Sequence, residues 1–321
     1  MEDLSLPVLF QKYLHYGEVI RNYRKMTLRA YRYSFKVFLD ETHIDSILEV
    51  TRASLERFLF EGRTKRNWSS VTFRQYFKHL NCFFKWCINQ GYLEENPLTG
   101  VEQPRLEKRI PRRLTLDEAK LVLDASFHMR YAYRFEKYRN RAIIGVMLFA
   151  GLRKQEVINL KLRDVNLQER MIFVDQGKGA KDRSVPIGAR LSLILKEYLK
   201  DRKRLNRTSL QFFTGLNEKR PFGVQCIKKL FDRLRKRTKL DFSAHTLRHS
   251  FATLMLEGGC DIYTLSKMMG HAKITTTTIY LSCSHKQMTK SIEMHPLNGA
   301  EPWHLNFLLS IYRSSRCRVL W

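Results

Sequence analysis

The chain has few of the features that would place it in a membrane or in an oxidising compartment. Its longest apolar run, Ala142 to Leu152, is too short to span a bilayer. The start, MEDLSLPVLF, is acidic and lacks the layout of a signal peptide. The six cysteines are scattered, without a CxxC pair or a Cys/His spacing typical of a metal site. We therefore expect a cytoplasmic protein with reduced thiols, no bound metal and no membrane association.

Negative charge is also scarce. The chain has 31 Asp and Glu against 58 Lys and Arg, a formal net charge of +27. Such an excess favours a polyanionic partner, and nucleic acid before a membrane surface, because no long amphipathic anchor accompanies it. A basic enzyme that does not act on nucleic acid remains the alternative on charge alone.

A length of 321 residues predicts two domains, each large enough for its own core. Four stretches near the start show helical periodicity, with aromatic residues on one face and basic residues on the others: residues 5–16, 27–41, 51–61 and 69–90. We expect residues 1–99 to form a four-helix bundle that lies on DNA phosphates. A basic segment with two prolines, residues 100–114, reads as an extended linker.

The second domain is expected over residues 115–298, opened by a capping box of Thr115 and Glu118. A buried helix from Ala142 to Ala150 and a break at Gly151 should bring Arg153 to the start of the next helix. Two further helices are expected at residues 189–203 and 222–238.

Two short β-type runs, MIFVD and RSVPI, flank the Gly-rich segment QGKGAKD and predict a hairpin. Lys178 lies between two glycines at its tip, and Lys181 is the competing cation. The whole pattern predicts a mainly α protein of two domains, the second a mostly helical α+β domain with a small antiparallel sheet.

The stretch Ser243 to Ser282 holds two histidines, an arginine and a tyrosine in forty residues: His245, Arg248, His271 and Tyr280. His245 and Arg248 are three residues apart and share a helix face, whereas the offset apolar set Leu247, Phe251, Leu254 and Met255 is expected in the core. Gly270 closes a second helix just before His271. An arginine fork matches phosphate oxygens, imidazoles donate or move protons, and a phenol is a nucleophile, so this set favours phosphodiester chemistry.

Six residues in order, with their surroundings AGLRKQEV, GKGAKDRSVPI, HTLRHSFAT and MMGHAKITTTTIY, resemble the tyrosine recombinase (phage integrase) family, especially its Xer-like and mobile-element integrases. The likeness covers residues 5–298. The six are Arg153, Lys178, His245, Arg248, His271 and Tyr280. The resemblance implies the tyrosine recombinase fold, with a SAM-like core-binding domain before the catalytic domain.

The resemblance implies that Tyr280 attacks a DNA phosphate, leaving a 3′-phosphotyrosine and a free 5′-hydroxyl that Lys178 protonates. Arg153 and Arg248 would hold the non-bridging oxygens, with His245 and His271 assisting. The covalent bond conserves the phosphodiester energy, so no cofactor, ATP or metal is required.

Relatives of this kind imply further partners. We expect double-stranded DNA recombination sites, a monomer or dimer in the free state, a homotetramer on synapsed DNA, and accessory DNA-bending proteins. The segment exchanged between neighbours would be residues 284–297. Lys154 and Gln155 depart from the usual small or apolar pair after the first arginine, and residues 299–321 form a tail beyond the usual end.

Three alternatives to a mobile-element integrase remain. A type IB topoisomerase shares the tyrosine chemistry and relaxes DNA without a defined site. A catalytically silent DNA-binding regulator on the same fold would lack a catalytic residue. A chromosome-dimer resolvase of the Xer type is the same enzyme class with another biological role.

Overall fold

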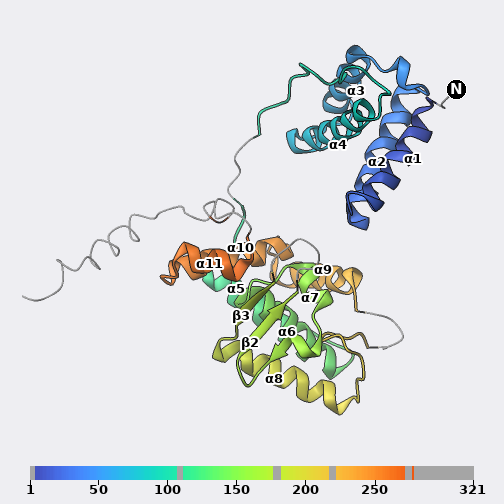
Figure 1. Cartoon of the computed structure of the whole chain (residues 1–321). Helices are drawn as coiled ribbons and strands as arrows, with labels where there is room; N and C mark the ends of the chain where they lie inside the picture. Colours follow the sequence, from blue (N-terminus) through green and yellow to red (C-terminus); the bar gives the residue numbers. More distant parts are fainter. Residues whose placement is uncertain (1–3, 107–110, 176–181, 217–221, 272–276, 278–321) are drawn as a thin grey trace, which may run out of the picture. The chain divides into compact units, whose positions relative to one another are not determined.

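The computed structural model describes residues 4–106, 111–175, 182–216, 222–271 and 277 (Figure 1). The chain divides into two compact units, Met1–Arg109 and Ile110–Trp321, and each is described by itself. Among the described residues, no helix is both long enough and apolar enough to cross a membrane.

The first unit is the four-helix bundle that the sequence predicts. Its helices are α1 (Leu6–Val19), α2 (Lys25–Thr42), α3 (Arg52–Thr64) and α4 (Ser70–Asn89), and α4 packs against each of the other three. Side-chain caps explain two of the starts: Thr51 and Ser54 form a capping box at α3, and Ser69 accepts from the backbone of Thr72 at α4.

The core of this bundle is aromatic. The rings of Phe10 and Phe35 stack with centroids 3.8 Å apart, and Phe83 meets Phe35 edge-on at 5.1 Å. All three side chains are buried, and each buried aromatic contributes on the order of 2 kcal/mol by leaving water. The aromatic positions that recur at helical spacing in the sequence therefore make the core.

The second unit contains seven α-helices and a small sheet among its described residues. The helices are α5 (Leu116–His128), α6 (Arg134–Phe149), α7 (Lys154–Asn159), α8 (Ala189–Arg204), α9 (Val224–Thr238), α10 (Ala244–Glu257) and α11 (Ile262–Met269). The strands β1 (Val165–Asn166), β2 (Met171–Val174) and β3 (Arg183–Pro186) pair antiparallel in that order. This is the mostly helical architecture with a small antiparallel sheet that the sequence predicts.

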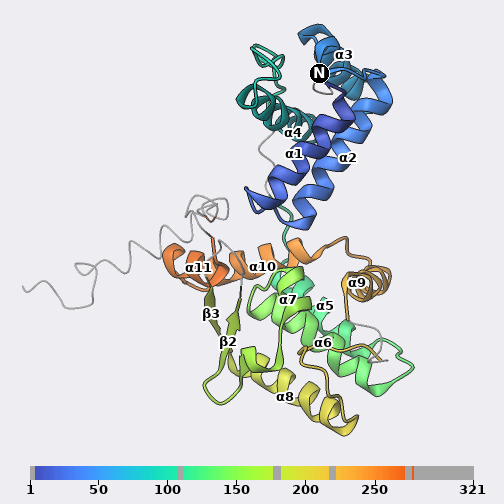
Figure 2. The same ribbon diagram turned by 45° about the vertical axis from the view of Figure 1, so that its right-hand side comes forward.

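Helix α6 is the centre of this unit, because α5, α8 and α10 all pack against it (Figures 1 and 2). The predicted buried helix was too short: α6 begins at Arg134, eight residues before Ala142. Arg139 and Asn140 are polar and yet buried, since Arg139 donates to the carbonyl of Thr214 and to Asn140 Oδ1. These two buried polar residues interrupt the apolar pattern, so the sequence pattern placed the start of the helix too late.

The hairpin of β2 and β3 is also as predicted. Ile172 pairs with Val185, and Val174 pairs with Arg183 as the last pair before the tip. β3 begins beside α11, with which it is in contact, and its first residue, Arg183, donates to the carbonyl of Met268 (Figures 1 and 2). The tip itself, with Lys178 and Lys181, lies outside the described residues.

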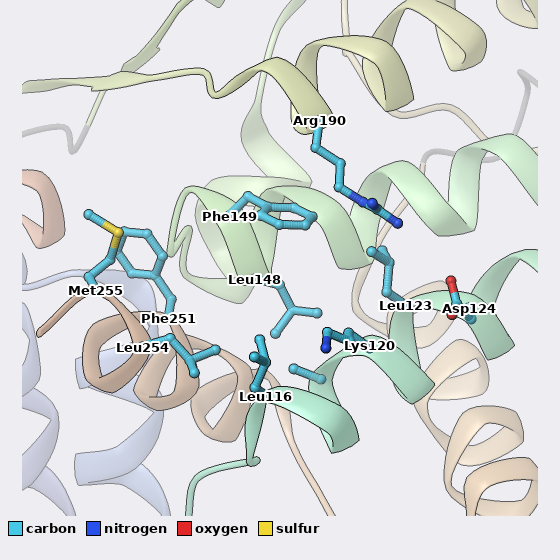
Figure 3. Close-up of a pocket in the computed structure, with 11 residues that line it drawn as sticks. Leu116, Lys120, Leu123, Asp124, Leu148, Phe149, Arg190, Phe251, Leu254 and Met255 are labelled. Carbon is cyan, nitrogen blue, oxygen red and sulfur yellow. The ribbon is translucent and has the colours of Figure 1, made fainter. Parts of the chain in front are cut away.

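Helix α10 corrects part of the predicted core. Leu247 and Phe251 are buried, as expected, but Leu254 and Met255 are only partly buried. They line an open apolar groove instead, because the helix face on which they lie is not fully covered by α5 in the described residues (Figure 3).

Candidate functional site

The first site arginine is positioned by a tight turn between α6 and α7. Gly151 has φ +61°, and a Cβ there would lie 2.4 Å from the ring of Phe251, so only glycine fits. Arg153 is the N-cap residue of α7, and Glu156, three residues on, accepts from its backbone N at 2.7 Å. The turn thus aims the Arg153 side chain, which is one-third exposed, toward solvent at the start of α7.

Glu156 is held by two arginines. Arg153 Nη1 donates to Oε1 at 2.6 Å, and Arg183 donates to both carboxylate oxygens at 2.9 and 2.8 Å. Burial alone would raise the pKa of Glu156, but the hydrogen bonds and charge of Arg183, with those of Arg153, outweigh it and lower the pKa to about 2. Glu156 is therefore an anion at neutral pH that orients two guanidinium groups.

The second predicted arginine, Arg248, is buried in α10 with 4% of its surface exposed. Its Nη1 donates to the carbonyl of Gly151 at 2.5 Å, and its Nη2 donates to the carbonyl of Met269 at 2.5 Å. The same Nη2 lies 3.2 Å from His271 Nε2. Arg248 thereby links the turn before α7 to the end of α11.

His271 follows α11 directly, because Gly270 adopts φ +63° and ends that helix. Its Nδ1 lies 2.8 Å from Thr277 Oγ1. Burial lowers the pKa of the ring to about 4, helped by the nearby positive charges of Arg248, Arg153 and Arg183. His271 is therefore neutral at physiological pH.

His245 is an exposed residue one turn before Arg248 on α10. Both line a cavity of about 240 Å³ whose lining residues come mainly from α7, α9 and α10. Six of the lining residues are cationic or imidazole side chains: Arg153, Lys154, Lys228, Arg235, His245 and Arg248. A cavity with this lining is suited to a phosphate group.

The structure thus brings four of the six predicted site residues together: Arg153, His245, Arg248 and His271. The other two, Lys178 and Tyr280, lie outside the described residues. No group of three or more His, Cys, Asp or Glu side chains within the described ranges could hold a metal ion.

Arg183 is a residue that the sequence reasoning missed. It is the first residue of β3 and only 8% exposed. Side chains alternate along a strand, so Arg183 lies on the same face as Val185, which is buried. A charged residue at such an inward position indicates a buried partner, and this pattern in the sequence could have identified Arg183.

A larger hollow in the second unit has a different character. This apolar groove, of about 400 Å³, is lined by α5, α10, the end of α6 and Arg190, and Phe149, Leu254 and Met255 face into it (Figure 3). It contains none of the predicted site residues. Its lining suits apolar side chains and not a phosphate.

Known protein families match both units of the chain. The phage integrase family matches residues 112–287, and the phage integrase N-terminal SAM-like domain matches residues 9–94. Tyrosine recombinase XerA of Pyrococcus horikoshii is 31% identical over 269 residues, covering 84% of this chain and 87% of the relative. Tyrosine recombinase XerD of Staphylococcus saprophyticus is 28% identical, covering 91% and 99%.

Solved structures share the fold. The Tn1549 transposon integrase, in complex with a circular intermediate DNA, has a TM-score of 0.73 at 17% identity and covers 91% of this chain and 99% of its own. The XerH site-specific recombinase, bound to a palindromic difH substrate, has a TM-score of 0.71 at 22% identity, covering 89% and 83%. The phage integrase family matches most of the second unit, and the N-terminal SAM-like domain matches the helix bundle of the first. The chain therefore belongs to the phage integrase family, the tyrosine recombinases.

Proposed function

We propose that this recombinase cuts and rejoins DNA at specific sites by using Tyr280 as nucleophile and the cavity between α7, α9 and α10 as the seat of the scissile phosphate. The observation that carries the proposal is the convergence of Arg153, His245 and Arg248 at that cavity, with His271 in contact with Arg248. Two guanidinium groups supply the planar donors that match non-bridging phosphate oxygens.

In the cleavage step, the Tyr280 oxygen bonds to phosphorus, and the bond from phosphorus to the 5′-oxygen breaks. Lys178 gives a proton to that leaving oxygen, so a free 5′-hydroxyl and a 3′-phosphotyrosine result. The phenol proton passes to a base at the site, for which the imidazole of His245 is suited by its exposed position in the cavity lining. Rejoining is the reverse, with the incoming 5′-hydroxyl as nucleophile.

The arginines stabilise the charge that develops on the phosphorane. The side chain of Arg153 is partly exposed to solvent. Its hydrogen bonds to Glu156 and to the carbonyl of Gly270, at 3.2 Å, fix the orientation of the guanidinium group. Arg248 is fixed by the carbonyls of Gly151 and Met269. Donors that are held in place before the reaction stabilise a transition state without reorganisation.

The partner is double-stranded DNA. The net charge of +27 and the six basic or imidazole groups in one cavity support phosphate contacts. We assign residues 1–99 to a core-binding domain, 100–114 to a linker, 115–298 to the catalytic domain and 299–321 to a C-terminal tail to which we assign no role. The division of the chain between Arg109 and Ile110 is in line with this assignment.

On two synapsed sites the protein is proposed to act as a homotetramer, with accessory DNA-bending proteins, and to be a monomer or dimer when free. The apolar groove supports exchange of C-terminal segments, because an amphipathic segment such as residues 284–297 of a neighbouring copy needs an apolar seat. The reaction serves either integration and excision of a mobile element or Xer-type resolution of chromosome dimers. Deletion of the gene distinguishes these two roles. Cells would retain circular elements in the first case and unresolved chromosome dimers in the second.

The experiment uses covalent capture. A pool of random-sequence duplexes, each nicked beside a candidate scissile phosphate so that the short 5′-hydroxyl fragment diffuses away, is incubated with the protein. Wild type is expected to retain a subset covalently without ATP or added metal. Arg248→Ala should abolish capture while electrophoretic-shift binding of the captured sequence persists. Relaxation of any supercoiled plasmid, irrespective of sequence, would instead support topoisomerase-like activity.

A further inference from the structure

Arg183 is a buried charged residue to which the proposed reaction gives no step. Its side chain is 5% exposed, and each of its nitrogens donates: Nη1 and Nη2 to the two oxygens of Glu156, and Nε to the carbonyl of Met268 at 2.7 Å. Unlike Arg248, Arg183 does not line the cavity between α7, α9 and α10, so we do not expect it to contact the DNA phosphate. Its contribution must pass through the groups that it holds.

Those groups form one assembly at the carboxyl end of α11. Three consecutive carbonyls there accept from three different arginines: Met268 from Arg183, Met269 from Arg248, and Gly270 from Arg153. The last carbonyls of a helix have no partner within the helix and carry the negative end of its dipole, so cations stabilise them. The three arginines thereby fix the direction in which the chain continues to His271.

We propose that Arg183 is a positioning residue for DNA cleavage, which holds Glu156 and through it Arg153, and which fastens strand β3 to the carboxyl end of α11. This inference rests on the proposed function. Because Arg183 pairs with Val174, the contact also ties β2 to the carboxyl end of α11.

Stability is not the distinctive contribution of this contact. A buried ion pair gives little net stability over apolar residues of the same volume, because two charges must be desolvated. An apolar residue at position 183 could not hold both carboxylate oxygens of Glu156. The other contacts of Glu156 orient Arg153. The bidentate fork is a geometric constraint, and lysine cannot reproduce it.

The test compares Arg183→Gln with a matched control, Arg202→Gln. Arg202 is a buried arginine in the same unit, 5% exposed, and donates to the backbone carbonyls of Arg207, Ser209 and Gln211. Single-turnover cleavage of the captured suicide duplex at saturating protein should fall about 100-fold in Arg183→Gln, as misplacement of reacting groups by about 1 Å does. Its DNA Kd should change by less than about threefold, and Arg202→Gln should cleave at the wild-type rate per folded molecule.

Two further variants separate geometry from charge and from unfolding. Arg183→Lys keeps the charge and should remain slow, whereas full recovery by lysine would overturn the geometric claim. In a Glu156→Gln background, Arg183→Gln should slow cleavage much less than in wild type, since both changes break the same contact. Full additivity of the two effects, or wild-type cleavage by Arg183→Gln, would overturn the proposal.

A measurement without DNA keeps the inference testable by itself. The His271 ring faces Arg248, Arg153, Arg183, His249 and the Thr277 hydroxyl. Removal of the Arg183 charge should raise the ring pKa in an NMR titration of the free protein, and Arg202→Gln should leave it unchanged. An unchanged value in Arg183→Gln would show that Arg183 does not act at this helix end, even if wild type captured no duplex and the proposed function had failed.

Discussion

The guanidinium of Arg248 donates from Nη2 to the Nε2 atom of His271 across 3.2 Å. Because a guanidinium has donors only, Nε2 must be the acceptor, and the neutral ring carries its proton on Nδ1. That proton is donated to Thr277 Oγ1 at 2.8 Å. One histidine is thus fixed in a single tautomer by an arginine on one side and a hydroxyl on the other.

The neutral ring makes folding dependent on pH. The folded pKa of His271 is lowered to about 4 from its ordinary 6.5, mainly by burial, so between these values the unfolded chain binds a proton that the folded chain does not. Stability from this group is present above pH 6.5 and is lost as the pH falls toward 4. Urea unfolding of wild type and His271→Gln should show a flatter pH dependence for the variant in this window. Equal slopes would contradict the assignment.

Replacement of the shared carboxylate should destabilise the second unit. Glu156→Gln leaves Arg153 and Arg183 without their counter-ion, and loss of one partner of a buried pair costs about 3–5 kcal/mol. The control is Glu197→Gln, since Glu197 is half-exposed and its ion pair with Arg141 contributes less than about 1 kcal/mol. Chemical denaturation gives both values. A loss under about 1 kcal/mol for Glu156→Gln would mean that water replaces the carboxylate.

Much of this arrangement follows from the sequence. Helical spacing of aromatic residues predicts the bundle, Gly151 predicts the turn before Arg153, and Gly270 predicts the helix end before His271, because each feature depends on residues close in the chain. Pairing across long separations is different. The contact of Arg183 with Glu156 spans 27 residues and its contact with Met268 spans 85, and no local pattern encodes either.

The exposure of side chains along α10 is a second feature that local sequence does not predict. Leu254 and Met255 continue the apolar spacing of Leu247 and Phe251, so periodicity alone assigns all four to the core. Coverage depends on where α5 and α6 end, which is a property of the packed unit. The start of α6 could not be predicted from local spacing either, because buried Arg139 donates to a carbonyl 75 residues away in the chain.

The choice between two lysines is open to direct test. We expect Lys178→Ala to slow single-turnover cleavage by on the order of 100-fold or more, because it removes the general acid for the 5′-oxygen. Lys181→Ala serves as the control and should have a small effect. A substrate with a 5′-sulfur leaving group needs no such acid and should restore the rate of Lys178→Ala. Equal defects in both variants would contradict the assignment.

The apolar groove predicts a defect in assembly without a defect in chemistry. Leu116 lines the groove, is 55% exposed and begins α5, where an acidic residue is favourable to the helix, so Leu116→Glu should fold. It should weaken tetramer formation on paired sites, as seen by sedimentation, while cleavage by single protomers persists. Leu121→Glu, at 49% exposure on the same helix but outside the groove lining, should assemble normally. Normal assembly by both would exclude the groove as the seat of the exchanged segment.

The central claim is that Tyr280 forms the covalent bond to DNA, and peptide mapping of the captured complex tests it most directly. Wild type should yield a nucleotide-linked peptide that contains Tyr280, formed without ATP or added metal, and Tyr280→Phe should bind the same duplex without covalent capture. Covalent capture by Tyr280→Phe, or linkage at another residue, would contradict the account.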